Sequence, residues 1–146
     1  MVDSWQLVQS SSGQVVVPRL ALAVTFWQRL RGLQFRRRLS SGSGLLLAPC
    51  RSIHTHWMFF AIDVAMLDSN GQVLALHRAV SPWSILYGPA GTHIVVEALA
   101  GGLAGCLAVG DGVCLQRTPT GDRRPGAKLS LPPREPRPLP LPVRSG

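Results

Sequence analysis

The sequence predicts an α+β domain, mainly antiparallel and barrel-like, with two short helices. Three observations support this fold class. Short β-prone runs alternate with turn signals, the pair Asn70-Gly71 favours a tight hairpin, and two short segments carry helix boundaries. Strands that arrive mainly through hairpins build antiparallel sheets. A length of 146 residues is typical of a single domain.

The β-prone runs are expected to form strands in chain order. Residues 5–8 and 15–24 flank a Ser/Gly-rich loop and predict an opening hairpin. The turn at Asn70-Gly71 predicts a second hairpin between the runs 56–67 and 73–80. Further strands are expected over residues 45–47, 93–99 and 113–116.

Two helices complete the predicted domain. Thr25 stands where an N-cap residue is expected and Gly32 where a helix is expected to end, which predicts about two turns over residues 25–32. Phe26, Leu30 and Leu33 fall on one side of this helix, so that side should face a core. The second helix is expected over residues 102–107.

The last part of the chain differs in composition from the rest. Residues 117–146 hold eight of the twelve prolines and a net charge of +5, out of +8 for the whole chain. Proline removes hydrogen-bond donors, and this stretch has too little apolar area to offset chain entropy. We therefore expect one domain over residues 1–116 and a basic, disordered tail with polyproline II character over residues 117–146.

Composition also limits the cellular setting and the chemistry. The apolar runs are far shorter than the roughly 20 residues of a membrane-spanning helix, and the start lacks the pattern of a secretory signal, so we expect a cytoplasmic protein. Cys50, Cys106 and Cys114 form no CxxC pair, so they predict buried thiols rather than a disulfide framework or a zinc ribbon.

Many short segments of the chain match one family pattern in the right order. They are Arg31-Gly32-Leu33, Arg36, Gly44-Leu45-Leu46-Leu47, Cys50, Ser52-Ile53-His54-Thr55, Met58, Ile62-Asp63-Val64, Leu67-Asp68, Gly71, Pro82-Trp83 and Gly110-Asp111. In these positions the chain resembles domain of unknown function family 192, a bacterial and archaeal family, over about residues 15–116. The resemblance implies a small, mainly β domain and brings no established activity.

Four residues form the candidate ligand site: His54, Trp57, Asp63 and Trp83. The leading hypothesis is a non-catalytic module that binds a small molecule or peptide at a pocket or edge near them. Asp63 lies in an apolar run, where an unpaired carboxylate is costly to bury. We therefore expect a buried ion pair with Arg31 or Arg36, since arginine can bond both carboxylate oxygens.

Two alternatives rest on other residues. A small enzyme could use Cys50 or the pair His54 and His56, which are expected on one face of a strand and could share a metal with Cys50, His77 or His93. The ligand set is incomplete, so no metal, cofactor or catalytic residue is assigned. Arg36–Arg38 could contact nucleic acid without sequence specificity, but only Phe35 is interleaved with them for base stacking, which favours a solvated basic surface.

Overall fold

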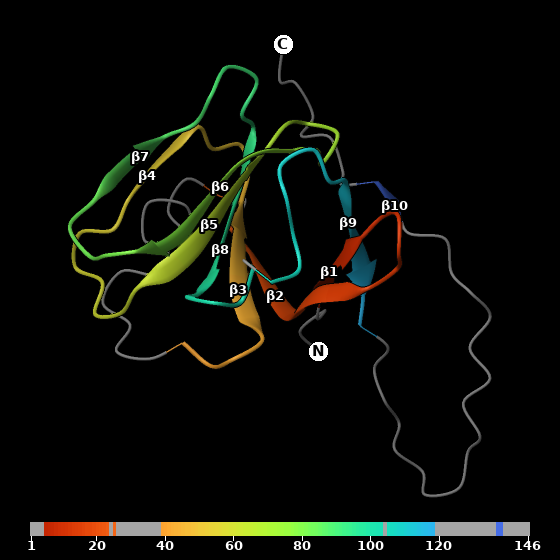
Figure 1. Ribbon diagram of the computed structural model, residues 1–146, viewed down its shortest axis with the longest axis horizontal. Helices are drawn as coiled ribbons and strands as arrows, with labels where there is room; N and C mark the ends of the chain where they lie inside the picture. Colours follow the sequence, from red (N-terminus) through yellow and green to blue (C-terminus); the bar gives the residue numbers. More distant parts are fainter. Residues whose placement is uncertain (1–4, 24, 26–38, 104, 119–136, 139–146) are drawn as a thin grey trace, which may run out of the picture.

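Short aliphatic runs separated by glycine-containing turns fold as strands throughout the computed structural model (Figure 1). The structure describes residues 5–23, 25, 39–103, 105–118 and 137–138. The strands are β1 (Trp5–Gln9), β2 (Val15–Ala23), β3 (Ser43–Leu47), β4 (Ser52–His54), β5 (Ile62–Leu67), β6 (Val73–Val80), β7 (Ile85–Tyr87), β8 (Ile94–Leu99), β9 (Val113–Arg117) and β10 (Arg137–Pro138). None of the described residues is helical, so this part of the chain is all-β and the α+β prediction is wrong. Nor does the described part hold a helix long and apolar enough to cross a membrane.

The two predicted helices have different outcomes. Most of residues 25–32 lie outside the described residues, so the first helix stays a prediction. The described residues of the second, 102–107, form turns instead, with the N–H groups of Cys106 and Leu107 both donating to the carbonyl of Leu103 at 3.0 Å. Glycines at 101, 102 and 105 raise the entropic cost of a helix here. The N–H of Leu103 bonds to the Asp63 carboxylate rather than to a helix backbone.

Eight strands form one sheet in the order β10-β9-β1-β2-β3-β8-β5-β6. All neighbouring pairs are antiparallel except β2 and β3, which are parallel. The predicted barrel-like closure is wrong, because β6 and β10 remain the two ends of the sheet. The turn between β5 and β6 does reach the start of β9, but through a single bridge between Gln72 and Gly112 rather than a ladder.

Both predicted hairpins are confirmed. β1 pairs with β2 across the loop that contains Gly13, and β5 pairs with β6 across Asn70-Gly71. Gly71 has a φ of 86°, a conformation that glycine adopts without a steric penalty. The carboxylate of Asp68 accepts the N–H groups of Asn70 and Gln72, both at 2.9 Å, which fixes this turn.

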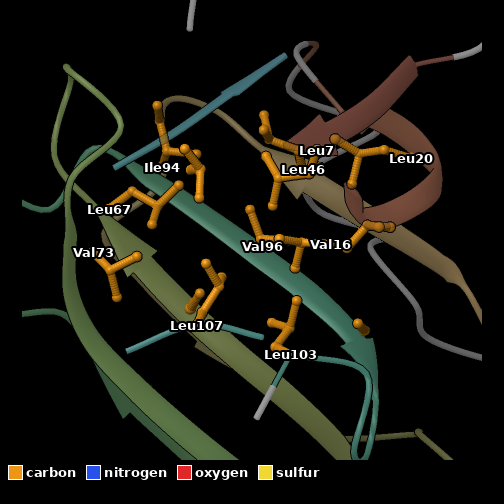
Figure 2. Close-up of a cluster of buried hydrophobic side chains, with 14 of the residues drawn as sticks. Leu7, Val16, Leu20, Leu46, Leu67, Val73, Ile94, Val96, Leu103 and Leu107 are labelled. Atoms are coloured by element: carbon orange, nitrogen blue, oxygen red, sulfur yellow. The ribbon is translucent and has the colours of Figure 1, made fainter. Parts of the chain in front are cut away.

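Buried side chains form two clusters, one on each side of the central strands. Ile94, Val96 and Ala98 of β8 belong to the first core, shown in part in Figure 2, whereas Val95 belongs to the second. Alternation along a strand explains this division. A strand buried on both faces reads as a continuous apolar run, which is why residues 94–96 and 45–47 were recognisable as strands.

A separate sheet of β4 and β7 lies over the second core. Ile53 of β4 and Leu86 of β7 are opposite each other and pack into this core with Met58. The expected strand 56–67 is correspondingly shorter, since β5 begins only at Ile62 and residues 56–61 form a loop. The small sheet and its flanking loops hold most of the candidate site.

The predicted tail is described at two residues only. Arg137 and Pro138 form β10, where they pair with Leu115 and Cys114 of β9. Residues 119–136 and 139–146 lie outside the described residues, so the disorder of the tail and the domain boundary near residue 116 stay predictions.

Candidate functional site

The outer side of the small sheet carries apolar and aromatic side chains. Ser52 lies opposite Tyr87, and His54 lies opposite Ile85. Because alternate residues of a strand point to opposite sides, these four face away from the core that holds Ile53 and Leu86. Ile85 is 54% exposed and Tyr87 is 76% exposed.

Two loops extend this outer side, one after β4 and one before β7. The rings of Trp57 and Trp83 meet edge to face, with centroids 5.0 Å apart. The ring of His56 lies 5.3 Å from that of Trp83 and 5.0 Å from that of His54. We call this surface the aromatic face; its members are His54, His56, Trp57, Trp83, Ile85 and Tyr87.

The backbone at both tryptophans is in the left-handed region. Trp57 has a φ of 63° and Trp83 a φ of 66°. Bulky residues rarely adopt this conformation, and each instance costs about 1–3 kcal/mol. Yet Trp57 and Trp83 remain 53% and 59% exposed, so packing recovers less than half of the area that their rings offer. Core formation alone does not account for this arrangement.

Thr55 joins the two loops that carry the tryptophans. Its side chain is buried, its hydroxyl donates to the carbonyl of Ser81 at 2.8 Å, and the same oxygen accepts the N–H of Ser84 at 2.7 Å. Its backbone N–H donates to the Ser84 carbonyl at 2.8 Å, and its carbonyl accepts the N–H of Trp83 at 3.1 Å. Thr55 was not among the sequence candidates, since an isolated threonine in a β-prone run carries no distinctive signal.

The histidines occupy different elements from those expected. β4 ends at His54 and His56 lies in the following turn, so the prediction that both project from one strand is wrong. Their rings nevertheless come close through the turn. Within residues 5–23, 25, 39–103, 105–118 and 137–138, no three His, Cys, Asp or Glu side chains gather in a group that could hold a metal ion.

Asp63 lies inside the fold rather than on the aromatic face. It is 1% exposed, which confirms the predicted burial. One carboxylate oxygen accepts the N–H of Ala79 at 2.9 Å, and the other accepts those of Gly101 at 3.0 Å and Leu103 at 3.1 Å. The structure thus brings together His54, Trp57 and Trp83 and places Asp63 in a backbone-binding role.

Several expectations fall on residues without a described position. Arg31, Arg36 and the run Arg36–Arg38 all lie outside the described residues. The ion pair with Asp63 and the basic surface therefore stay predictions. Among the thiols, only Cys114 is buried as expected, whereas Cys50 and Cys106 are half-buried; the Cys50 thiol donates to the carbonyl of Ser52 at 3.2 Å.

Glu97 is a second buried carboxyl group, and sequence reasoning missed it. It lies in β8 opposite Leu45 and Val64, and it is 3% exposed. Burial raises the pKa of this carboxyl group from 4.5 to about 7, because the charged form loses its hydration. One of its oxygens, Oε2, has no hydrogen-bond partner among the described residues. The signal was an acidic residue within an apolar run, the same signal that marked Asp63.

A small cavity of about 220 Å³ lies elsewhere, between the start of β3 and the end of β8. Val16 and Val17 line it together with two glycine-containing segments, residues 41–43, which lead into β3, and residues 98–102, at the end of β8 and in the turn after it. Arg19 lies beside the first segment, where its guanidinium donates to the carbonyl of Ser41 and to the hydroxyl of Ser43. None of the aromatic-face residues lines this cavity.

Comparisons with known proteins agree with this architecture. A protein of Thermococcus sibiricus named UPF0127 protein is 31% identical over 99 residues, which are 65% of this chain and 64% of that protein. The match thus spans slightly less than two thirds of the relative. A solved protein of Sinorhizobium meliloti, named as a candidate transcription regulator, shares 22% identity with a TM-score of 0.65 and covers 80% of this chain and 97% of its own. A protein of unknown function from Novosphingobium aromaticivorans shares 21% identity at the same TM-score, over 75% of this chain and 82% of its own.

The family assignment rests on a longer match. The two solved structures are below 25% identity, so they support the fold alone. The family model of domain of unknown function 192, described as "Uncharacterized ACR", matches residues 7–115, from Leu7 in β1 to Leu115 in β9. This range includes every residue of the aromatic face. The chain belongs to the family domain of unknown function 192.

Proposed function

We propose that this chain is a non-catalytic binding module whose aromatic face holds a small molecule or a peptide. The observation that carries the proposal is that the side chains of Trp57 and Trp83 are exposed and yet held in a fixed arrangement. Both rings are more than half exposed, both stand on left-handed backbone, and they contact each other edge to face. Exposed apolar patches with a fixed arrangement are typical of interaction sites.

The chemistry of the face favours a ligand that is uncharged where it makes contact. None of its six residues has a carboxylate, ammonium or guanidinium group. The indole N–H groups and the Tyr87 hydroxyl can donate hydrogen bonds, while the ring faces offer apolar area. A ligand with flat apolar groups and hydrogen-bond acceptors is complementary to such a surface.

The hydrogen bonds of Thr55 support binding rather than mere shielding of the core. They join the two tryptophan loops through contacts within the chain itself. A preformed site loses less conformational entropy when a ligand binds. The strained φ angles at Trp57 and Trp83 lie in the two loops that this network joins, and such strain is typical of functional sites.

The proposal is tested with a panel of peptides and metabolites against the full-length protein. We expect a binding ligand to raise the melting temperature and to shift the indole NMR signals of Trp57 and Trp83. Trp83→Ala should abolish the response, whereas Val109→Ala should keep it. Val109 is a matched control, since it is another exposed apolar residue, 64% exposed, outside the face. Ligands whose binding is unchanged in Trp83→Ala, or that perturb only the cavity residues, would contradict the proposal.

A further inference from the structure

We infer that the aromatic face binds a proline-rich segment in the polyproline II conformation, and that its occupant is the C-terminal segment, residues 137–146, of a second copy of this chain. This inference rests on the proposed function and names the ligand of the same face. It is argued from the dimensions of the face, from its donors, and from the position of this segment in its own chain.

Four rings of the face form a continuous row. Centroids along the series His54, His56, Trp83 and Trp57 are 5.0, 5.3 and 5.0 Å apart, so the row spans at most about 15 Å. A polyproline II helix rises about 3.1 Å per residue, so about five residues extend over such a row. The rings are too exposed to enclose a ligand, which favours an extended segment lying across them.

The donors of the face match the backbone of such a segment. A polyproline II helix has no internal hydrogen bonds, so its carbonyl groups are free to accept from indole N–H and phenol O–H groups. Proline rings pack against aromatic rings, and the stiff helix loses little entropy on binding. The face has no carboxylate, ammonium or guanidinium group that the ligand would have to neutralise.

The chain itself contains a segment of this kind. Residues 138–142 read Pro-Leu-Pro-Leu-Pro, five residues without charge, and the chain ends four residues later. In the polyproline II conformation these five residues extend over about 15 Å, which is long enough to cover the row of rings. The segment thus matches the face in length, apolar character and lack of charge.

The position of β10 favours a second copy over the same chain. Arg137 and Pro138 pair with β9, at one end of the large sheet, whereas the small sheet of β4 and β7 lies across the molecule (Figure 1). Within one chain, Arg137 and Pro138, where the segment begins, are therefore held at the end of the large sheet that lies away from the face. The pairing of β10 with β9 involves only two residues. It therefore competes only weakly with binding of the segment to the aromatic face of a second copy.

Complementation between two variants of the full-length chain tests the inference. The face variant is Trp83→Ala. The tail variant combines Leu139→Ser, Pro140→Ser, Leu141→Ser and Pro142→Ser, which leaves both residues of β10 unchanged. In sedimentation velocity, the wild type and Val109→Ala should self-associate as concentration rises, and each variant alone should associate at least about tenfold more weakly. An equimolar mixture of the two variants should recover one-to-one association, because one supplies the tail and the other the face.

Other outcomes overturn the inference in distinguishable ways. Indole signals that change in the tail variant at every concentration, without association, would show that the segment docks in its own chain. A synthetic peptide of residues 137–146 that binds the face of a protein that does not self-associate would assign the face to another proline-rich partner. If neither the peptide nor a second copy binds while a carbohydrate or metabolite still shifts Trp57 and Trp83, the inference fails and the proposed function stands. If nothing binds the face, both fail.

Discussion

Asp63 connects three segments of backbone with one side chain. It projects from β5 and accepts N–H groups from β6 and from the turn after β8. Both of its oxygens accept hydrogen bonds, three in all, and a carboxylate group has enough lone pairs to accept all of them. This requirement accounts for an acidic residue in a strand where every other residue is apolar.

Asp63→Asn should lower the free energy of unfolding by about 2–4 kcal/mol, measured by urea denaturation. The amide can accept through one oxygen only, and its NH₂ group would face at least one N–H. Asp68→Asn is the matched control, because the Oδ1 of Asp68 accepts both of its N–H groups and asparagine can replace it. Asp68→Asn should lower the free energy of unfolding by less than about 1 kcal/mol. Equal losses in the two variants would contradict the role given to Asp63.

The burial of Asp63 could be predicted from sequence, but its backbone donors could not, while the predicted ion pair with Arg31 or Arg36 stays a prediction. A carboxylate within an apolar run must be satisfied, and that condition was evident from residues 57–67. The donors found here are backbone N–H groups 16, 38 and 40 residues away. Every residue except proline carries such a donor, so composition does not distinguish the ones that are used.

At the scale of elements, Thr55 holds together the loops that present the aromatic face. Thr55→Val keeps the shape of the side chain but removes its hydroxyl. The N–H of Ser84 then loses its acceptor in a half-buried position, which should cost about 1–2 kcal/mol of stability. We also expect broadened indole NMR signals from Trp57 and Trp83, since both loops lose their common contact.

Thr92→Val provides the control for that experiment. Thr92 is also buried, and its hydroxyl donates to the carbonyl of Pro89 at 2.7 Å. Its loss should lower stability but leave the indole signals of Trp57 and Trp83 sharp. Identical indole spectra in Thr55→Val and the wild type would show that other contacts maintain the face.

Elements with local determinants were predictable, whereas those that depend on distant contacts were not. The hairpin at Asn70-Gly71 is determined by the turn itself, so its position agrees with the sequence. Residues 56–61 are equally β-prone but form a loop, in which Met58 packs into the second core. The described residues of 102–107 form turns instead of the predicted helix, in a segment where glycines at 101, 102 and 105 raise the entropic cost of a helix.

At the scale of the molecule, the order of strands was beyond sequence reasoning. β2 and β3 are parallel, and β8 lies between β3 and β5, so neighbouring strands are far apart in the chain. The aromatic face is also non-local, since β4 and β7 are paired across the whole β5–β6 hairpin. His54, Trp57 and Trp83 were recognised individually, but Ile85 and Tyr87 could be added only once the small sheet was known.

The two-sided burial of β8 also makes the stability of the whole domain depend on pH. Glu97 faces the second core beside Leu45 and Val64, with His77 one strand further on. Its pKa is raised from 4.5 to about 7, so the folded state keeps a proton that the unfolded chain releases. Stability should therefore fall as pH rises between about 4.5 and 7, by about 3 kcal/mol in total, and then level off. Glu97→Gln removes this dependence. The variant should equal the wild type near pH 4 but exceed it by about that amount at pH 8, as measured by urea denaturation across this range. The difference between the two proteins isolates Glu97, because both contain the same four histidines. A difference that stays constant from pH 5 to pH 8 would mean that Glu97 is ionised throughout and that the second core accommodates its charge.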